Sequence, residues 1–279
     1  MPTVSVPAAI YCQHNADASR DIPAEGYGGW TSADIDLSIG KTALVVMHAW
    51  RWEKGAYPGW DRCVEYWPRA DRIVRSVFPG LLSGARAAGL RILHVTGGGG
   101  YYTNLPGYRR TVECAGVAPE AAAGALPDEG IAALRALRRE RGFPGAGNGA
   151  DVQRGWAELD FPDEARPAAD EYICDSAWQL NAVCRHLGIV HLIYAGFAIN
   201  WCLLLSPGGM SDMGRLGYLC STIREAVTAV ENRESARTEA HKEEALWRVA
   251  LGFGFVFDLA PFLNALHDAP HPETYNNIK

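Results

Sequence analysis

The sequence predicts an α/β fold, a three-layer α-β-α sandwich in which helices cover both faces of a mostly parallel sheet. Short apolar runs, such as 42–47 and 190–195, are typical of strands that are buried on both faces of a parallel sheet. Segments with helical spacing separate these runs, so strand and helix alternate through most of the 279 residues. Apolar residues make up 48% of the chain and charged residues 21%, which suits a globular protein with a sizeable core.

The first predicted elements lie between residues 42 and 100. The strand at 42–47 is followed by a segment, 69–88, whose apolar residues recur at helical spacing and which ends at Gly89. A second strand is predicted at 90–95, and the glycines 97–100 follow it directly. Because ligands of parallel sheets sit beyond the carboxyl ends of the strands, the segments after both strands are candidate parts of a site.

The second half of the chain continues this alternation without an internal sequence repeat. We expect helices at 177–187, 200–213, 239–251 and 260–267, and strands at 190–195, 216–220 and 254–257. The end of the strand at 190–195 is the third candidate position for a site.

Two parts of the chain are less regular. Residues 1–40 carry Pro, Gly and Asp with little periodicity, and we expect an extended arm that packs on the domain or on a neighbouring subunit. Residues 104–170 contain one predicted helix, 129–141, among Pro, Gly and Ala clusters, and are too short and irregular for a core of their own. We therefore predict a single domain, 41–279, with an insertion at about 104–170.

Charge and composition restrict the classes of partner. The net charge of −6 gives no electrostatic case for nucleic acid or for an anionic membrane. The sequence has no apolar run of the roughly 18 residues that a membrane span needs, and its start lacks the pattern of a secretory signal. The 7 cysteines are dispersed and form no C-x-x-C pair, which indicates thiols in a reducing compartment. We expect a cytoplasmic protein that acts on a small molecule.

The most informative segment runs from residue 191 to residue 202. An apolar strand ends at Gly196, a tight turn follows, and Cys202 falls in the first turn of the next predicted helix. Unpaired backbone N–H groups and the helix dipole favour a thiolate there, and the same groups can hold a developing oxyanion. The other interpretation is that Cys202 is a small core residue at a crowded turn.

Four segments resemble those of the isochorismatase-like hydrolases, which include nicotinamidases and N-carbamoyl amidohydrolases. Residues 195–202, Ala-Gly-Phe-Ala-Ile-Asn-Trp-Cys, are similar to the family's A-G-x-x-T-x-x-C segment. The other three are 41–49, similar to the first strand, 175–178, similar to a Y-S-A-F helix start, and 241–246, similar to a late H-x-x-A-L helix. The resemblance covers roughly residues 40–100 and 170–266 and implies the isochorismatase-like form of the predicted sandwich.

The resemblance also implies a set of site residues. In this family an aspartate, a lysine and a cysteine form the triad, and the cysteine, here Cys202, attacks an amide-type carbonyl. A cis peptide bond is implied at Ala198–Ile199, with an oxyanion hole made by the N–H groups of Ile199 and Cys202. The chain departs from the pattern at the other two positions, where His48 replaces the aspartate and Tyr172 replaces the lysine.

His48 is a chemical substitute for the missing aspartate. An imidazole beside a thiol is a workable nucleophile–base pair, because histidine titrates near neutral pH. Asp170, Glu171 and Asp175 are candidates to orient the imidazole, and Tyr172 is a candidate hydrogen-bond donor. The alternative is that His48 is a satisfied buried histidine in a site that has lost catalysis.

Aromatic residues lie in or next to the predicted site loops. We expect Trp50, Tyr101, Trp178 and Trp201 to line a pocket for an apolar ligand, including one that bears a ring. The alternative is that these side chains pack in the core or in a subunit interface. The glycines 97–100 lack the spacing of a phosphate loop, and we expect neither a metal nor a cofactor.

Three functions remain open at this stage. The first is a hydrolase that cleaves a C–N bond of a small amide, imide or carbamoyl compound through a thioester on Cys202. The second is a catalytically silent relative that binds a small molecule or a partner. The third is hydrolysis of a vinyl ether, as in isochorismatase itself, which relies on the acid at the position of His48. Members of the family are usually oligomeric, so we expect a homo-oligomer.

Overall fold

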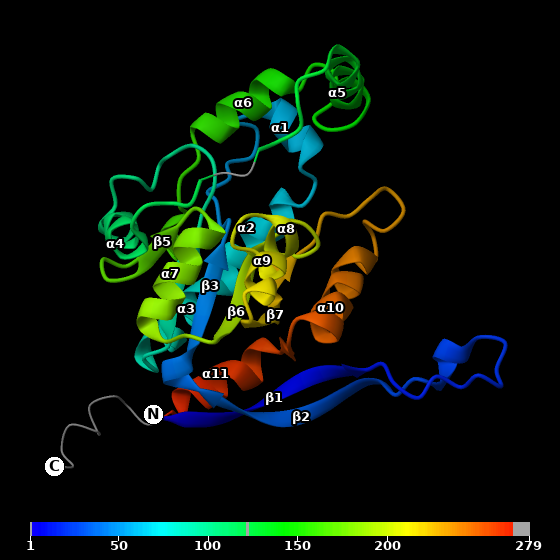
Figure 1. The fold of residues 1–279 in the computed structure, drawn as a ribbon, viewed down its shortest axis with the longest axis vertical. Helices are drawn as coiled ribbons and strands as arrows, with labels where there is room; N and C mark the ends of the chain where they lie inside the picture. The colour runs from blue at the N-terminus through cyan, green and yellow to red at the C-terminus, as the bar shows by residue number, and fades with distance from the viewer. Residues whose placement is uncertain (1, 121–122, 270–279) are drawn as a thin grey trace.

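A computed structural model describes residues 2–120 and 123–269, which fold around one eight-stranded sheet (Figure 1). The strand order across the sheet is β2 (Gly29–Ser38), β1 (Thr3–Cys12), β8 (Val256–Phe257), β7 (Leu219–Thr228), β6 (His191–Phe197), β3 (Thr42–Met47), β4 (Arg91–Val95) and β5 (Tyr172–Cys174). From β8 to β5 all neighbouring strands are parallel, whereas β1 is antiparallel to both of its neighbours. The predicted mostly parallel sheet is confirmed.

Helices pack on both faces of the sheet, which completes the predicted three layers. One core cluster joins the sheet to helices α2 (Trp67–Ser76), α3 (Phe78–Ala87) and α11 (Leu259–His267). The cluster on the other face joins it to α7 (Ala177–Leu187), α9 (Met210–Arg215) and α10 (Ala240–Gly252). Every residue of β3 and β6 is buried, as expected for central strands covered on both sides.

Local sequence signals explain several element boundaries. Helix α7 begins where the Ser176 hydroxyl accepts the N–H of Gln179 and ends at Gly188, whose φ of 68° is left-handed. The helix predicted at 200–213 is two short helices, α8 (Cys202–Leu205) and α9, because the chain turns at Ser206–Gly209. The helix predicted at 69–88 is likewise divided at Val77 into α2 and α3.

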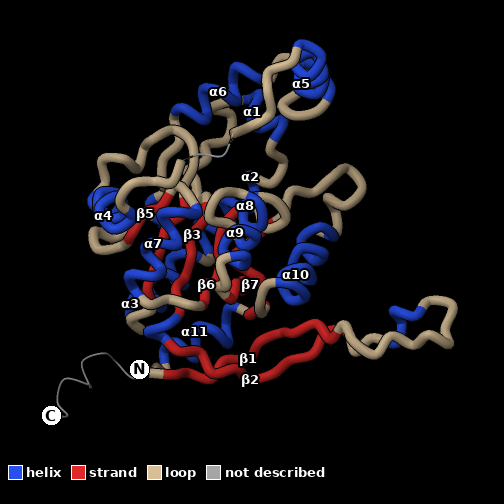
Figure 2. Tube along the Cα trace, viewed as in Figure 1, coloured by secondary structure: helices blue, strands red, loops and turns tan. Residues whose placement is uncertain are grey.

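The first forty residues form a hairpin of strands β1 and β2, followed by the short helix η2 (Ile39–Lys41). Sequence analysis missed these strands, because few apolar side chains anchor them, mainly Val4, Val6 and Ala8 on β1 and Leu37 on β2. Strand β1 joins the main sheet through β8. The connection between the two strands, with η1 (Pro23–Gly26), projects from the body (Figure 2).

In its described residues, the region predicted as an insertion contains three α-helices, of which one was predicted. Helices α4 (Pro106–Ala115) and α6 (Gly149–Ala157) flank α5 (Glu129–Arg141), and η3 (Asp163–Ala165) follows them. Helix α5 has no buried residue, whereas α6 packs against α1 (Pro58–Cys63). Together α1 and α6 lie beyond the carboxyl end of the sheet (Figure 1). No helix in the described part of the chain is long and apolar enough to cross a membrane.

Candidate active site

The ends of three central strands meet beneath α1 and α6. Met47, the last residue of β3, is in register with Val95 on one side and with Gly196 on the other. A Cβ atom at Gly196 would lie 1.9 Å from the carbonyl oxygen of Met47, so only glycine allows this approach. The close packing brings the loop after β3, with His48, beside the turn that leads to Cys202.

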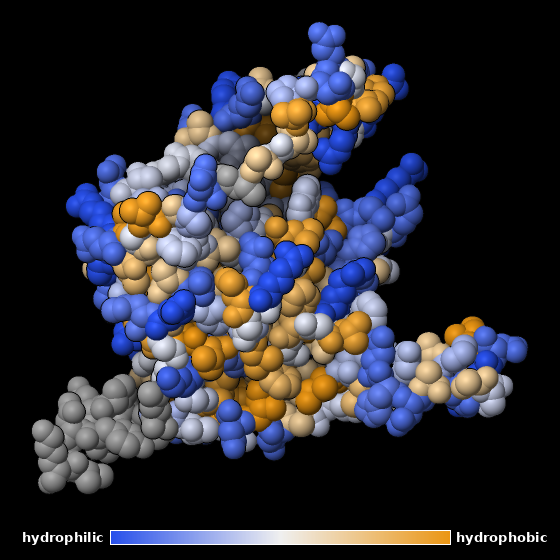
Figure 3. Space-filling model, in the orientation of Figure 1, coloured by the Kyte–Doolittle hydropathy of each residue, from blue (hydrophilic) through white to orange (hydrophobic). Residues whose placement is uncertain are grey.

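A cavity of about 260 Å³ opens at this edge of the sheet, and both His48 and Cys202 line it. Residues of α1, α2 and α6 supply further parts of its wall. Figure 3 shows the hollow between the segment with α5 and α6 and the rest of the molecule, with apolar side chains inside it. The cavity therefore unites the two residues that the sequence predicts as nucleophile and base.

Cys202 is the first residue of α8 and is half-buried. Because α8 has only four residues, its dipole offers little support for a thiolate. Burial raises the pKa of the Cys202 thiol, and hydrogen bonding from the Ser206 side chain and the Ala198 backbone opposes this rise. The expected shift toward a thiolate is thus not what the structure shows, and a neutral thiol needs a base to become a nucleophile.

The turn before Cys202 differs in one detail from the expected geometry. The cis peptide bond joins Phe197 to Ala198, one residue earlier than predicted. The N–H of Ile199, a predicted oxyanion donor, instead donates to the carbonyl oxygen of Thr228 at 2.9 Å. Ile199 is therefore corrected to a structural position, since its N–H is consumed by the continuation of the β6–β7 pairing. In the described chain, the N–H groups of Ala198 and Cys202 have no backbone acceptor and can receive an oxyanion.

His48 stands directly after β3 in a left-handed backbone conformation, with φ of 51°. Its ring stacks on that of Trp50 with 4.6 Å between ring centroids. Burial lowers the pKa of His48 to about 4, so the imidazole is neutral at neutral pH, with a lone pair available for a proton but with less basicity than an exposed histidine. Its Nδ1 is buried without a partner among the described residues, and no hydrogen bond joins the ring to Cys202.

The three carboxylates considered for orienting His48 lie elsewhere. Glu171 forms a buried network in which its carboxylate contacts His94 at 2.8 Å and accepts two hydrogen bonds from Arg86. Asp175 accepts a hydrogen bond from the Tyr108 hydroxyl at 2.8 Å. Asp170 lines a separate cavity. The imidazole of His48 is held by stacking and packing alone.

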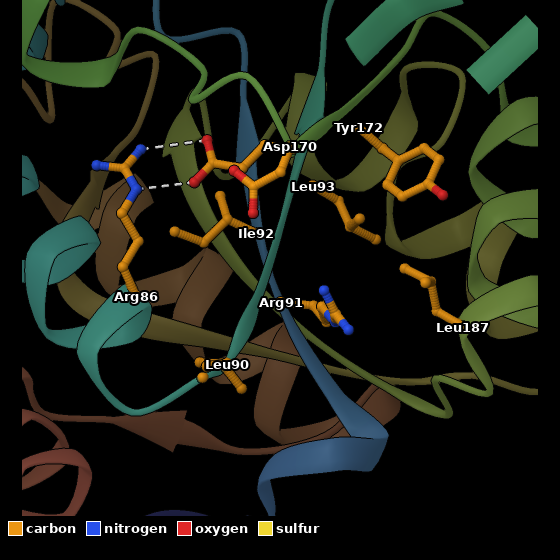
Figure 4. Close-up of a pocket in the computed structure, with 10 residues that line it drawn as sticks. Arg86, Leu90, Arg91, Ile92, Leu93, Asp170, Tyr172 and Leu187 are labelled. Carbon is orange, nitrogen blue, oxygen red and sulfur yellow. Dashed lines mark hydrogen bonds and ion pairs between the residues drawn. The ribbon is translucent and has the colours of Figure 1, made fainter. Parts of the chain in front are cut away.

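Tyr172 does not share the cavity of Cys202. It lies on β5 in register with Leu93, two residues before the strand end, and the Arg110 guanidinium lies 5.4 Å from the centre of its ring. Its side chain lines a second cavity of about 140 Å³ near the start of β4. Figure 4 shows Tyr172 and Leu187 on one side of that cavity and Arg86 on the other. The predicted role of Tyr172 as a hydrogen-bond donor to the site has no geometric support.

Of the four aromatic residues predicted to line the pocket, two line the cavity and two do not. Trp50 and Trp201 line the cavity. Tyr101 lies behind Trp50 and accepts a hydrogen bond from its Nε1 at 2.9 Å, so it supports the wall rather than forming it. Trp178, 38% exposed at the start of α7, is not among the lining residues.

Most of the wall was missed by sequence analysis, and it is strongly aromatic. The additional lining residues are Trp60, Val64, Tyr66, Trp67, Phe143, Trp156, Ser206 and Val230, together with a second thiol, Cys63. No lining residue carries a formal charge when His48 is neutral. Helical spacing from Cys202 points to Ser206, four residues on, but the tryptophans come from α1, α2 and α6, whose convergence the sequence does not reveal.

The described residues contain no group of three or more His, Cys, Asp or Glu side chains placed to hold a metal ion. The cavity presents the Cys202 thiol, the His48 imidazole and the Ser206 hydroxyl beside the backbone amides of the turn. These supply a nucleophile, a proton acceptor and hydrogen-bond donors, which are the parts that acyl transfer needs.

Comparison with known proteins gives similarity in structure only. No family model and no curated protein sequence matches the chain. A cysteine hydrolase from Pseudomonas syringae pv. phaseolicola 1448A is 14% identical, with 83% of this chain and 94% of that chain covered and a TM-score of 0.49. An isochorismatase family protein from Desulfovibrio vulgaris subsp. vulgaris str. Hildenborough is 20% identical, with 82% of this chain and 97% of that chain covered and a TM-score of 0.44.

An N-carbamoylsarcosine amidase from Thermoplasma acidophilum is 15% identical, with 79% of this chain and 96% of that chain covered and a TM-score of 0.40. At such identities and TM-scores the likeness does not extend to a reaction or a substrate. The chain is thus similar in general arrangement to solved structures described as isochorismatase-type and cysteine hydrolases.

Proposed function

We propose that this protein hydrolyses a C–N bond of a small amide, imide or carbamoyl compound, with Cys202 as nucleophile and His48 as base and acid. The observation that carries the proposal is their meeting in one cavity, beside two backbone N–H groups that have no backbone acceptor in the described chain. A thiol, a neutral imidazole and amide donors at one strand-to-helix turn are the requirements of acyl transfer.

The reaction has two halves. In the first, His48 accepts the thiol proton while the sulfur attacks the carbonyl carbon, and the amides of Ala198 and Cys202 donate to the developing oxyanion. The C–N bond then breaks, and the leaving nitrogen takes the proton from the imidazole. In the second half, His48 accepts a proton from water, whose oxygen attacks the thioester carbonyl. Breakage of the C–S bond releases the acid and returns the proton to the sulfur.

The wall of the cavity supports a neutral, apolar acyl group as substrate. Five tryptophans line it, namely Trp50, Trp60, Trp67, Trp156 and Trp201, and none of the lining residues is Asp, Glu, Lys or Arg. An ionised substrate group would lose hydration on entry without meeting an opposite charge. A flat or branched apolar group would instead replace water against indole surface.

A panel of primary amides with matched size tests the proposal through ammonia release. The members carry a neutral ring, a carboxylate or a trimethylammonium group on the same acyl framework. We expect turnover of the neutral member and its loss by about 10⁴-fold in Cys202→Ala. The control is Cys63→Ser, which removes the second thiol of the cavity and should keep most of the activity. Equal turnover by Cys202→Ala and the unaltered protein would eliminate Cys202 as nucleophile.

A catalytically silent binding protein is the second candidate, and one observation favours it. His48 makes no hydrogen bond to Cys202, and its Nδ1 has no partner among the described residues that would fix the ring. On this reading the neutral amide binds, quenches tryptophan fluorescence and is recovered intact. Binding that is unchanged in Cys202→Ala, with no ammonia released by any member of the panel, would favour this second function.

A further inference from the structure

The turn that carries the oxyanion donors is tied to the end of β7 by a single side chain. The β6–β7 ladder ends at the pair Phe197 and Thr228, after which the N–H of Ile199 still donates to the Thr228 carbonyl. One residue later, Asn200 takes over this role with its side chain. Its Nδ2 donates to the Val230 carbonyl at 2.8 Å, and its Oδ1 accepts the Val230 N–H at 2.9 Å.

This reciprocal pair imitates one more step of backbone pairing between parallel strands. The amide group of Asn200 offers one donor and one acceptor, which is the same set that a peptide unit offers. The turn from 198 to 201 is therefore held to β7 at two successive residues, Ile199 and Asn200. The N–H groups of Ala198 and Cys202 lie on either side of these anchors, and their direction depends on them.

The strand end that receives Asn200 is itself held from the opposite side. Arg69 on α2 donates to the Thr228 hydroxyl and to the Ala229 carbonyl, both at 3.1 Å. The same guanidinium bonds Glu65 at 2.8 Å, and Glu65 accepts the N–H of Glu231 at 2.7 Å. The Arg69 side chain is only 17% exposed, so these hydrogen bonds are largely shielded from water and restrain residues 228–231.

We propose that Asn200 is a positioning residue, whose paired hydrogen bonds with Val230 align the Ala198 and Cys202 amides with the thiol for acyl transfer. The inference rests on the proposed function of Cys202. Asn200 is not among the residues that line the cavity with Cys202, whereas its partner Val230 is. The effect of Asn200 on the reaction must therefore pass through the backbone of the turn or through Val230 at the cavity wall.

Two reactions of the Cys202 sulfur distinguish an effect of Asn200 on the alignment of the two amides from a general effect on the folding of the turn. Acylation by phenyl acetate builds negative charge on a carbonyl oxygen and needs the two amides, whereas alkylation by iodoacetamide builds no oxyanion. Mass spectrometry of the peptide that contains Cys202 measures both rates in the full-length protein. A change that merely loosens or exposes the turn alters both rates together, and misaligned amides alter acylation alone.

Asn200→Ala should slow acylation of Cys202 by about 10- to 100-fold, a part of the loss seen when an oxyanion donor is removed. Alkylation should stay within about threefold of the unaltered protein. Asn200→Asp keeps the acceptor for the Val230 N–H, so its acylation rate should lie between that of the unaltered protein and that of Asn200→Ala. This second variant keeps the test valid if the alanine variant does not fold. The matched control is Asn181→Ala on α7, which loses a similar half-buried hydrogen bond, from Tyr218 at 2.8 Å, away from the site.

The outcomes distinguish the two proposals. Equal acylation of Cys202 in the unaltered protein and in both Asn200 variants would overturn the positioning role and leave the proposed function standing. A parallel fall of acylation and alkylation would also overturn it, because that result marks a purely structural residue. No acylation of Cys202 in the unaltered protein, with phenyl acetate shown to enter the cavity by fluorescence quenching, would remove the proposed function and the positioning role with it.

Discussion

At the scale of single residues, His48 combines strain, burial and an unpartnered nitrogen. A left-handed φ of 51° is uncommon outside glycine, and such conformations persist where the surrounding structure enforces them. Stacking on Trp50 supplies part of that enforcement. The histidine thus occupies a strained position at the wall of an apolar cavity.

The pH dependence of the reaction should reflect this environment. Burial lowers the pKa of His48 from 6.5 to about 4, so its basic form persists down to that pH. The acid limb of kcat/KM is expected near pH 4, with activity falling as pH drops through this value. An acid limb near 6.5 would show that His48 titrates as an exposed histidine. Near-ultraviolet circular dichroism at each pH separates this titration from unfolding.

Glu171 should contribute to stability rather than to catalysis. Hydrogen bonds from His94 and Arg86 outweigh the effect of burial and lower its pKa from 4.5 to about 2. Because the folded-state pKa is depressed, its stabilising contribution is complete above the unfolded value and is lost as pH falls toward 2. Glu171→Ala should lower the free energy of unfolding by about 2 kcal/mol at pH 7, since His94 stays buried without its carboxylate partner, whereas Arg86 is 41% exposed and can be hydrated. Urea unfolding measures this difference, which should shrink below pH 4.

At the scale of elements, α2 matters because it braces the end of β7. Arg69→Met keeps the length of the side chain and removes its bonds to Thr228 and Ala229. We expect a loss of about 2 kcal/mol of unfolding free energy together with slower acylation of Cys202. Arg75→Met, on the same helix with a side chain 63% exposed, is the control and should change neither. An unaltered acylation rate in Arg69→Met would disprove the bracing role.

Helix α5 is the opposite case, a helix without a buried residue. Leu134 on α5 is 63% exposed, and its replacement by Ser should change the free energy of unfolding by less than about 0.5 kcal/mol. Leu180 on α7 is fully buried, and its replacement by Ala should cost about 2–5 kcal/mol. Thermal unfolding of the two variants compares them directly. A large cost at Leu134 would mean that α5 is covered in solution.

At the scale of the whole molecule, the elements with strong local signals were predictable and the cavity was not. The apolar run of β3 and the Ser176 and Gly188 boundaries of α7 place those elements at the predicted residues. The hairpin of β1 and β2 was missed because few of its residues are buried. Cys202 was selected because it follows a strand end, and His48 because it occupies the aspartate position of the family pattern; both line the cavity.

The remaining parts of the site depend on contacts between distant segments. Trp60, Trp67 and Trp156 meet only because α1, α2 and α6 converge over the sheet, and no periodicity reports that convergence. Tyr172 shows the converse, since its position in a motif suggested the site while its register in β5 places it in another cavity.

The central claim is that the sulfur of Cys202 becomes acylated with the help of His48. The most direct test is a time course of peptide mass spectrometry after mixing the protein with phenyl acetate at pH 7. The account predicts an acyl group that appears on Cys202, disappears as water releases it, and forms at least about tenfold more slowly in His48→Ala. An acyl group found instead on Cys63, or equally on Cys202 with and without His48, would contradict the account.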